Sequence, residues 1–261
     1  DRIAHAERVA AQKALLEIVP PNRHDNDLLL DTRPIPEQFW SLLGLDEGGD
    51  IYIARSNNTP IAAIIPTVSP DGYNGNIAMI VGVNVDGSIA GVRVVDHRET
   101  PGLGDKIELR KSNWILDFNG RSLKNTPTSA WAVKKNGGAF DQFTGATITP
   151  RAVINQLVNT LKYFEQDKSR LLALDQSSEI LGYKLAEAVQ DESKLNNTLY
   201  TQPIMVAVSY AMWCVWKERS SALPSYAAGH SLGEYTALVA NEFISLEDCL
   251  NLVVIRAKSM L

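Results

Sequence analysis

The stretch Asp141-Gln-Phe-Thr-Gly-Ala-Thr147, followed by Ile148-Thr-Pro-Arg151, joins a turn of small residues to the start of a predicted helix. Thr149 is a suitable N-cap because its hydroxyl can accept from free backbone N–H groups, and Pro150 suits the first helical position. Apolar residues then recur at helical spacing over Pro150–Asp167, at Val153, Ile154, Leu157, Val158, Leu161 and Phe164. Thr147 is therefore left on a turn whose backbone N–H groups can approach a phosphate closely.

An Asp-Gly pair between two apolar runs predicts a β-hairpin upstream of this turn. Ile77–Val85 and Ser88–Val95 have the composition of strands, and Asp86-Gly87 between them is a strong signal for a tight turn. We expect an antiparallel sheet from Ile51 through Val95. We also expect a helix at Asp1–Val19, where Ala, Leu and Ile recur at helical intervals before Pro20-Pro21.

The turn before the helix resembles the flavinylation motif of the FMN-binding domain in the G subunit of the Rnf/Rsx electron-transport complex. It is also similar to the motif in the C subunit of the sodium-pumping quinone reductase. In that family an Asp, two variable residues and a Ser or Thr precede Gly-Ala-Thr, whose Thr bears FMN through a phosphoester. The resemblance implies that FMN is esterified to Thr147 and is also contacted by Asp141, Thr144, Gly145 and Ala146. From the residues alone, the alternative is a plain turn with Thr149 capping a helix.

A second segment, His97–Lys106, resembles the family's other FMN-contacting loop. Its glycines would allow close backbone approach, and it offers a hydroxyl and a positive charge. The resemblance implies cofactor contacts from Glu99, Thr100, Gly102, Leu103, Gly104 and Lys106. Without the Thr147 motif, the same segment would indicate only a surface loop after a hairpin. Trp131–Lys135 and Asn136–Gly138 also fit the family's approach to the flavin turn, so the resemblance covers residues 1–170.

A different motif stands near the C-terminus, where Gly229-His-Ser-Leu-Gly233 fits the nucleophile elbow G-x-S-x-G. We expect a short strand at Ser225–Ala228 and a helix at Glu234–Val239, with Ser231 presented on the sharp turn between them. Backbone N–H groups at the helix start would then face a developing oxyanion.

The extended motif Gly229–Tyr235 resembles malonyl-CoA:acyl-carrier-protein transacylase. In that family a Gln lines the active site, and an Arg pairs with the malonyl carboxylate because a guanidinium forks onto both oxygens. The resemblance implies catalytic-site positions at Ser231, Arg256, Gln202 and His230. Arg256 alone would indicate only an ordinary cation on a helix surface.

Two parts of the transacylase site have no counterpart in this sequence. The family's oxyanion-hole Gln lies on a Gly-Gln-Gly-Ser-Gln loop, and nothing like it precedes Asp175. The family's general-base His lies far downstream of the elbow, whereas no histidine here follows Ser231; the four are His5, His24, His97 and His230. Because a serine without a base is a weak nucleophile, we expect no useful transacylase turnover.

Composition agrees with two domains. A chain of 261 residues with 45% hydrophobic content can fill two cores, and a net charge of −5 without a basic cluster argues against nucleic-acid binding. No metal-ligand spacing occurs, and both cysteines, Cys214 and Cys249, lie in the second part, which leaves the first compatible with an oxidising compartment. We expect Met205, Met212, Trp213 and Trp216 to fill the core around a helix at Pro203–Lys217.

The two resemblances imply different compartments. The Rnf-type domain works on the periplasmic face of the inner membrane, behind a membrane helix that would precede Asp1, whereas the transacylase works in the cytoplasm. This sequence has neither a transmembrane run nor a signal peptide, starts at Asp rather than Met, and is expected to be cut at both ends. The junction at Lys168–Asp175 has no Gly/Ser/Pro linker; one helix ends there and another pattern, Asp175–Val189, begins. We expect an artificial or accidental join of two gene fragments; the alternative is a true bifunctional fusion.

We therefore expect an α+β FMN-binding domain at residues 1–170, followed by a truncated α/β hydrolase-like acyltransferase fragment at residues 173–261. The favoured function is an electron-transfer subunit with covalent FMN, whose partners are the other Rnf/Rsx subunits and a flavin transferase. The alternative is an acyltransferase that moves malonyl from CoA to acyl carrier protein through a Ser231 acyl-enzyme. The third hypothesis is an inert product, and whether the chain is itself an enzyme stays open.

Overall fold

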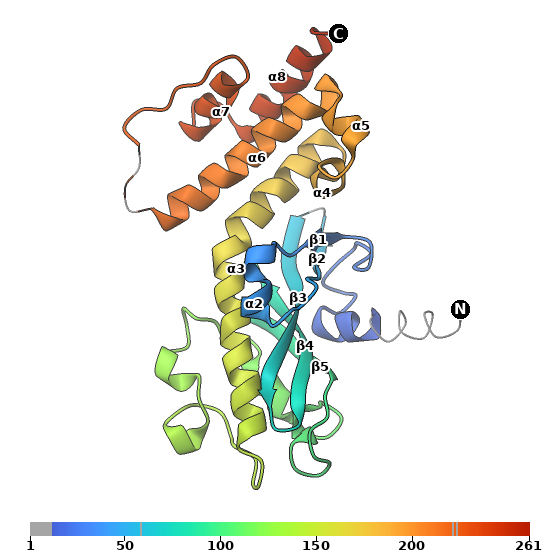
Figure 1. Ribbon diagram of the computed structural model, residues 1–261, viewed down its shortest axis with the longest axis vertical. Helices are drawn as coiled ribbons and strands as arrows, with labels where there is room; N and C mark the ends of the chain where they lie inside the picture. Colours follow the sequence, from blue (N-terminus) through green and yellow to red (C-terminus); the bar gives the residue numbers. More distant parts are fainter. Residues whose placement is uncertain (1–11, 58, 221, 223) are drawn as a thin grey trace, which may run out of the picture. The chain divides into compact units, whose positions relative to one another are not determined.

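The computed structural model describes residues 12–57, 59–220, 222 and 224–261, and the chain divides into two compact units, Asp1–Glu165 and Gln166–Leu261. The first unit is built around an antiparallel sheet, as the sequence predicts, and the second is built from helices (Figure 1). None of the helices in the described ranges is both long and apolar enough to cross a membrane. These ranges also hold no cluster of His, Cys, Asp and Glu side chains that could bind a metal ion.

The sheet of the first unit is an antiparallel meander of five strands in chain order. The strands are β1 (Thr32–Pro34), β2 (Asp50–Ser56), β3 (Thr59–Gly72), β4 (Gly75–Asn84) and β5 (Ile89–Asp96). The hairpin turn predicted at Asp86-Gly87 is confirmed, with Gly87 at φ +88° and the Asn84 N–H donating to Ser88 O at 2.8 Å. The sheet from Ile51 to Val95 is thus confirmed, and β1 extends it at one edge.

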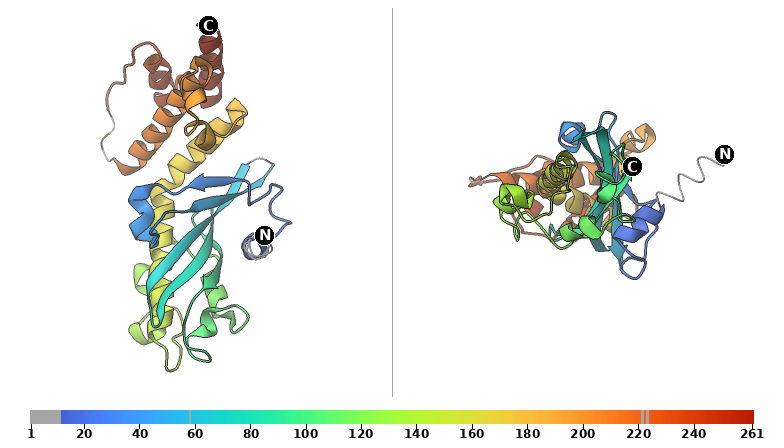
Figure 2. Two further views of the ribbon diagram at one scale, coloured as in Figure 1. Left: turned by 45° about the vertical axis from the view of Figure 1, so that its right-hand side comes forward. Right: turned by 90° about the horizontal axis from the view of Figure 1, so that it is seen from below.

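Helices cover both faces of the sheet (Figure 2). On one face, residues 12–18 form a helix that buries Leu15 and Ile18 against the strands, while residues 1–11 of the predicted helix Asp1–Val19 lie outside the described residues. A Cβ at Gly82 would lie 2.2 Å from Ile18 Cγ2, so this helix approaches the backbone of β4 closely. On the other face runs the first half of α3, where Gln156 Nε2 donates to Thr67 Oγ1 at 2.6 Å.

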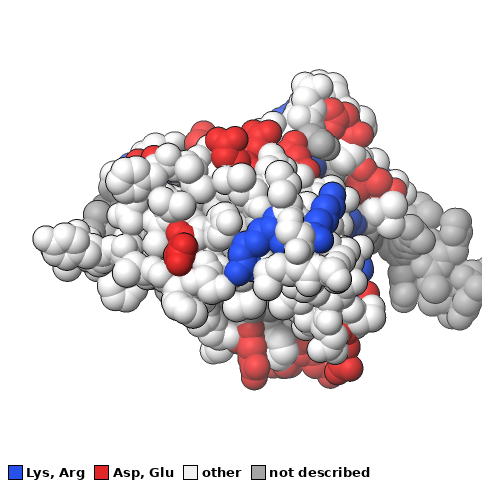
Figure 3. Space-filling model, turned by 90° about the horizontal axis from the view of Figure 1, so that it is seen from above, with Lys and Arg blue, Asp and Glu red and all other residues white. Residues whose placement is uncertain are grey.

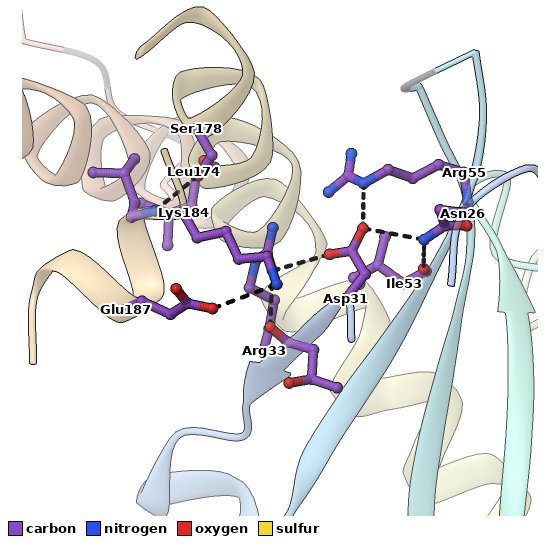
Figure 4. Close-up of polar contacts among 11 residues, drawn as sticks. Asn26, Asp31, Arg33, Ile53, Arg55, Leu174, Ser178, Lys184 and Glu187 are labelled. Atoms are coloured by element: carbon purple, nitrogen blue, oxygen red, sulfur yellow. Dashed lines mark hydrogen bonds and ion pairs between the residues drawn. The ribbon is translucent and has the colours of Figure 1, made fainter. Parts of the chain in front are cut away.

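Buried charges fasten the β1–β2 edge of the sheet around Asp31 (Figure 4). Asp31 Oδ1 accepts from Arg33 Nη1 at 3.1 Å, and its Oδ2 accepts from Arg55 Nε at 2.6 Å. Asn26 Nδ2 donates to the same carboxylate at 3.1 Å and to Ile53 O at 2.8 Å. Both arginines are buried, so this pairing offsets the cost of removing their charges from water.

Between β5 and α3 the chain has little regular structure beyond short 3₁₀ turns. They are η2 (Asp105–Ile107), η3 (Asn113–Phe118), η4 (Thr128–Ala130) and η5 (Lys134–Asn136), and the short pair η1 (Glu37–Phe39) and α2 (Trp40–Leu43) lies earlier in the chain. An aromatic cluster holds this segment together, formed by Trp114, Phe118, Trp131, Phe140 and Phe143. The segment can therefore present loops at fixed positions without a sheet of its own.

Helix α3 (Ile148–Leu181) is longer than the predicted helix Pro150–Asp167. The predicted break near Lys168–Asp175 is wrong, because this segment contains strong helix formers and neither Gly nor Pro. The helix ends only at Gly182, which has φ +73°. For the same reason the pattern Asp175–Val189 is not one helix: its first part belongs to α3 and a short α4 (Leu185–Ala188) follows Gly182.

The second unit continues with α5 (Glu192–Leu195), α6 (Thr198–Arg219), α7 (Gly233–Ala240) and α8 (Leu246–Lys258). Its core combines residues of α4, α6, α7 and α8: Leu185, Ala188, Ile204, Val206, Ala207, Val239, Leu246, Cys249, Leu250 and Val253. The helix predicted at Glu234–Val239 is confirmed. The strand predicted at Ser225–Ala228 is wrong: these residues have no regular structure, and the described part of this unit offers no strand with which they could pair.

Helix α6 begins earlier than predicted, at Thr198, where the Asn197 side chain accepts from Leu199 N. The prediction that its large residues fill the core is wrong for three of them, because Met205, Met212 and Trp216 are 55%, 62% and 55% exposed. The helix is apolar on every side, yet the helices that pack on it leave the stripe of Met205, Met212 and Trp216 exposed. Uncharged residues dominate the face in Figure 3, where basic groups form a short central patch, an acidic group lies to its left, and further acidic groups lie toward the edges.

Candidate functional site

The turn Thr144–Thr147 leads directly into α3. The Ala146 N–H donates to Phe143 O at 3.1 Å, and Gly145 has φ +79°, a conformation that favours glycine. Thr144 and Gly145 are exposed, while Ala146 and Thr147 are half-buried. Within the described part of the chain, the Thr147 hydroxyl has no hydrogen-bond partner. The turn thus presents a free hydroxyl beside the unpaired N–H groups of a helix start.

The role predicted for Thr149 as N-cap is wrong. The helix already begins at Ile148, so Thr149 lies inside its first turn and is fully buried. Its hydroxyl donates to Glu99 Oε2 instead of accepting from the helix. A buried carboxylate is a stronger acceptor than the alternatives available to a threonine hydroxyl, and this long-range bond takes precedence over local capping. Pro150 is accordingly the third helical residue, where its missing N–H is still without cost.

The loop His97–Lys106 lies against this turn, as the resemblance implied. A Cβ on Gly145 would lie 3.4 Å from Leu103 Cδ2, and one on Gly104 would lie 3.0 Å from Thr149 Oγ1. The loop is itself a turn, in which Thr100 O accepts from Leu103 N at 3.1 Å and from Gly104 N at 2.9 Å. Leu103 is 40% exposed beside the turn, and Lys106 is half-buried in η2.

Not all residues of this loop face outward. Glu99 is only 4% exposed, and its Oε1 accepts from the Asn74 N–H at 2.9 Å. Gly102 has φ +77° and open space around it, and its N–H donates to Asp105 Oδ1 at 2.9 Å. That bond, assisted by Lys111, lowers the pKa of Asp105 below its usual value. Glu99 therefore has an inward, supporting position, while Gly102 lies at the open side.

Sequence reasoning missed the residues that support the turn from behind. Trp114 Nε1 donates to Asp141 O at 2.9 Å, and its ring meets Phe143 edge to face at 5.0 Å. The side chain of Asp141 pairs with Lys134 at 2.7 Å on an exposed surface. The available signal was the density of aromatic residues between Trp114 and Phe143 in a segment without strand or helix pattern.

A histidine supports the second loop. His97 Nδ1 accepts from the Glu99 N–H at 3.0 Å, so its Nε2 carries the proton that is directed to Glu108 Oε1 at 2.9 Å. The guanidinium of Arg110, and next His97, lower the pKa of Glu108. The chain Glu108–His97–Glu99 thus fixes the backbone from which the loop starts.

In the second unit the backbone has the geometry of a nucleophile elbow. Ser231 has φ +56°, and the Gly233 N–H donates to His230 O at 3.0 Å. A Cβ on Gly229 would lie 2.0 Å from the Gly233 carbonyl, so no other residue fits there. Gly233 itself has open space around it.

Three of the four predicted catalytic residues lie together. Arg256 Nη2 donates to Ser231 Oγ at 2.8 Å, and its Nη1 donates to Gln202 Oε1. Gln202 is buried and is held by a bond from its Nε2 to Thr198 Oγ1 at 2.6 Å. The fourth, His230, is exposed and shares no hydrogen bond with Ser231 in the described residues. An arginine stays protonated and cannot take the serine proton, so this arrangement can bind an anion but does not activate the hydroxyl.

Cys249 adds no nucleophile to this unit. Burial raises the pKa of Cys249 to about 11, which keeps it a thiol at neutral pH. Its Sγ lies 3.5 Å from Tyr235 O, within the core.

Two family models match the chain, the FMN-binding domain over residues 72–162 and the acyl transferase domain over residues 151–261. The chain is 49% identical over 177 residues to the G subunit of the ion-translocating oxidoreductase complex of Pseudomonas aeruginosa (strain UCBPP-PA14), which covers 68% of this chain and 82% of that relative. It is 48% identical over 169 residues to the protein of the same name from Shewanella amazonensis, covering 65% and 78% respectively.

Among solved structures, the acyl-carrier-protein S-malonyltransferase from Burkholderia pseudomallei 1710b is 41% identical, with a TM-score of 0.35, over 37% of this chain and 32% of that one. FabD from Acinetobacter baumannii is 39% identical, with a TM-score of 0.35, over 36% and 30%. The chain thus spans about a third of the length of these transferases.

Proposed function

The chain belongs to the family of the G subunit of the ion-translocating oxidoreductase complex, and from that membership we propose that it is the flavin-carrying electron-transfer subunit of such a membrane complex. We assign this role to residues 1–170, with FMN held covalently through a phosphoester to Thr147. When bound, the isoalloxazine ring supplies the capacity to accept and donate electrons. The protein attaches the FMN, orients its ring and determines from which side other subunits can approach it.

The observation that carries the proposal is the free, half-buried hydroxyl of Thr147 at the start of α3, on a turn that needs glycine at position 145. A phosphate there would meet backbone N–H groups at the positive end of a 34-residue helix. In the attachment step a P–O bond forms between Thr147 Oγ1 and the flavin phosphorus, and the hydroxyl proton is lost. The bond from phosphorus to the leaving group of an activated flavin donor breaks, so the chain gains the mass of FMN minus water.

The adjoining loop is suited to orient the ring. Leu103 offers an exposed apolar side chain beside Gly145, while Gly102 leaves room for close approach. Thr100 and Lys106 would supply a hydroxyl and a positive charge, and Asp141, Thr144 and Ala146 would complete the site around the phosphoester. Glu99 is excluded from direct contact by its burial and acts as support.

The partners follow from this function. A flavin transferase would install FMN, and other subunits of the complex would exchange electrons with it. We propose that the flavin domain is membrane-associated and faces the periplasm.

A second candidate function concerns residues 173–261, because Arg256 bonds both Ser231 and Gln202. We propose that this cluster binds the malonyl group of malonyl-CoA, the donor for acyl carrier protein in the transacylase reaction, without useful turnover.

The test of the flavin proposal is the intact mass of Thr147→Ala after co-expression with a flavin transferase and export to the periplasm. Wild type should gain FMN minus water on the peptide that contains Thr147, and Thr147→Ala should gain nothing. Thr128→Ala is the matched control, since it removes an exposed hydroxyl from η4, outside the proposed flavin site, and should keep the flavin. Flavin on Thr147→Ala, or its loss from Thr128→Ala, would overturn the assignment.

A further inference from the structure

The carboxylate of Glu99 is enclosed where three segments of the first unit meet. Its Oε1 accepts from Asn74 N at 2.9 Å, in the turn between β3 and β4, and its Oε2 accepts from Thr149 in α3. A Cβ on Gly72 would lie 3.0 Å from Oε1, and one on Gly104 would lie 3.1 Å from Oε2. The space around the carboxylate therefore admits only these small residues and the two donors.

Thr149, which bonds Glu99, follows the proposed attachment residue Thr147 by two positions in the sequence. Thr149 is fully buried, and its hydroxyl is committed to Glu99, whereas Thr147 keeps a free hydroxyl at the helix start. The backbone from Thr147 to Thr149 is thus anchored on one side by a charge-assisted hydrogen bond. Glu99 is in turn held from behind, because its N–H donates to His97 Nδ1 at 3.0 Å.

We propose that Glu99 is a positioning residue for flavin attachment: by holding Thr149 Oγ1 it fixes the first turn of α3 so that Thr147 Oγ1 faces the flavin donor. This inference rests on the proposed attachment at Thr147. It assigns Glu99 a role through Thr149 and not through contact with the flavin. It also explains why the loop that starts at His97 stays against the turn, since Glu99 belongs to that loop and bonds the helix that follows the turn.

The test compares initial rates of flavin attachment by a flavin transferase in Glu99→Gln, which replaces the charged acceptor by a neutral amide, and in Thr149→Val, which removes the donor; both keep side-chain size. Thr149→Val should be slower than wild type by about tenfold, the rate equivalent of a lost hydrogen bond to a charged group, and Glu99→Gln should be slower by a smaller factor, because a neutral amide accepts more weakly. The double variant should be no slower than Thr149→Val, because both changes act on the same bond. Thr149→Ser should recover most of the rate, since it restores the hydroxyl.

Thr160→Val is the matched control, because Thr160 is another fully buried threonine of α3, whose hydroxyl bonds within the helix to Gln156 O at 2.8 Å. It should lose stability without losing attachment rate, which separates positioning from general destabilisation. Wild-type rates in Glu99→Gln and Thr149→Val, or an equal loss in Thr160→Val, would overturn the inference. If wild type itself carried no flavin on Thr147, the proposed function would fail instead, so the two failures are distinguishable.

Discussion

The flavin turn Thr144–Thr147 and the nucleophile elbow Gly229–Gly233 share a local design. Each uses glycine to bring a hydroxyl residue to the start of a helix, α3 in one unit and α7 in the other. They differ in the residues that pack against them. The flavin turn is backed by the aromatic cluster, by buried Thr149 and by a neighbouring loop, whereas the segment before the elbow, residues 224–230, is exposed and without regular structure. A motif match therefore describes a backbone, and the surrounding residues decide whether chemistry can follow.

The hydroxyls also meet different neighbours. Thr147 is free to receive a group, while Ser231 is bonded to the guanidinium of Arg256. The first arrangement suits an attachment point that an external enzyme modifies. The second lacks a proton acceptor, and so it suits binding better than catalysis.

The largest expected effect comes from breaking the elbow backbone. In Gly229→Ala the new Cβ would lie 2.0 Å from the Gly233 carbonyl and 2.3 Å from Glu234 N, neither of which can move without distorting α7. We expect the second unit to lose about 2 kcal/mol of stability, while the first unit is unchanged. Hydrogen exchange measured by mass spectrometry should show faster exchange in peptides of α6, α7 and α8, which share one core, and unchanged exchange in the sheet of the first unit.

Gly233→Ala is the matched control, since a Cβ there has no heavy atom within 4 Å. It should leave exchange unchanged or slow it slightly, because alanine favours the helix. Equal effects of the two substitutions would show that the elbow backbone is not held in the geometry described.

Sequence patterns predicted the features whose causes are local. The Asp86-Gly87 turn, helix α7 and the glycine requirement at the elbow each depend on a few adjacent residues. In the candidate sites, a family resemblance predicts Ser231, Arg256 and Gln202 in one site, and the three side chains are hydrogen-bonded to one another through Arg256. A family resemblance likewise predicts that the loop containing Leu103 lies near the flavin turn, and Leu103 is adjacent to Gly145 of that turn.

The errors arose where a distant partner decides the outcome. Thr149 was assigned as a cap because its acceptor, Glu99, lies 50 residues away in the sequence. The strand at Ser225–Ala228 depended on a neighbouring strand that no local pattern can supply. Trp216 is 55% exposed because the apolar spacing of a helix does not determine whether another helix covers that side. Helix α3 was split because two resemblances meet there, while helix propensity continues to Gly182.

Limited proteolysis should give the next largest effect, and it compares the two units directly. Tyr226 is 91% exposed in an irregular segment, and Tyr73 is 65% exposed in the tight turn between β3 and β4. Chymotrypsin needs a locally extended chain, so cleavage after Tyr226 should be at least about tenfold faster than cleavage after Tyr73. The fragments can be followed by mass spectrometry over time.

Tyr226→Gly serves as the control, since it removes the fast site and should leave the rate at Tyr73 unchanged. Cleavage at Tyr73 as fast as at Tyr226 would show that the segment before the elbow is held as firmly as the first unit.

The smallest expected effect concerns binding at the elbow. Arg256→Met keeps much of the length of the side chain and removes the guanidinium that bonds Ser231 and Gln202. We expect the Kd for malonyl-CoA, measured by calorimetry, to rise about fivefold, because the pair is partly exposed and a partly solvated charge contributes only about 1 kcal/mol. Arg256→Lys should recover part of the affinity, since a point charge cannot fork onto both carboxylate oxygens. Lys258→Met, which removes an exposed cation from the same helix, should bind like wild type. An unchanged Kd in Arg256→Met would mean that the elbow keeps the backbone of a transferase without its binding function, and the contrast with the flavin turn would then be complete.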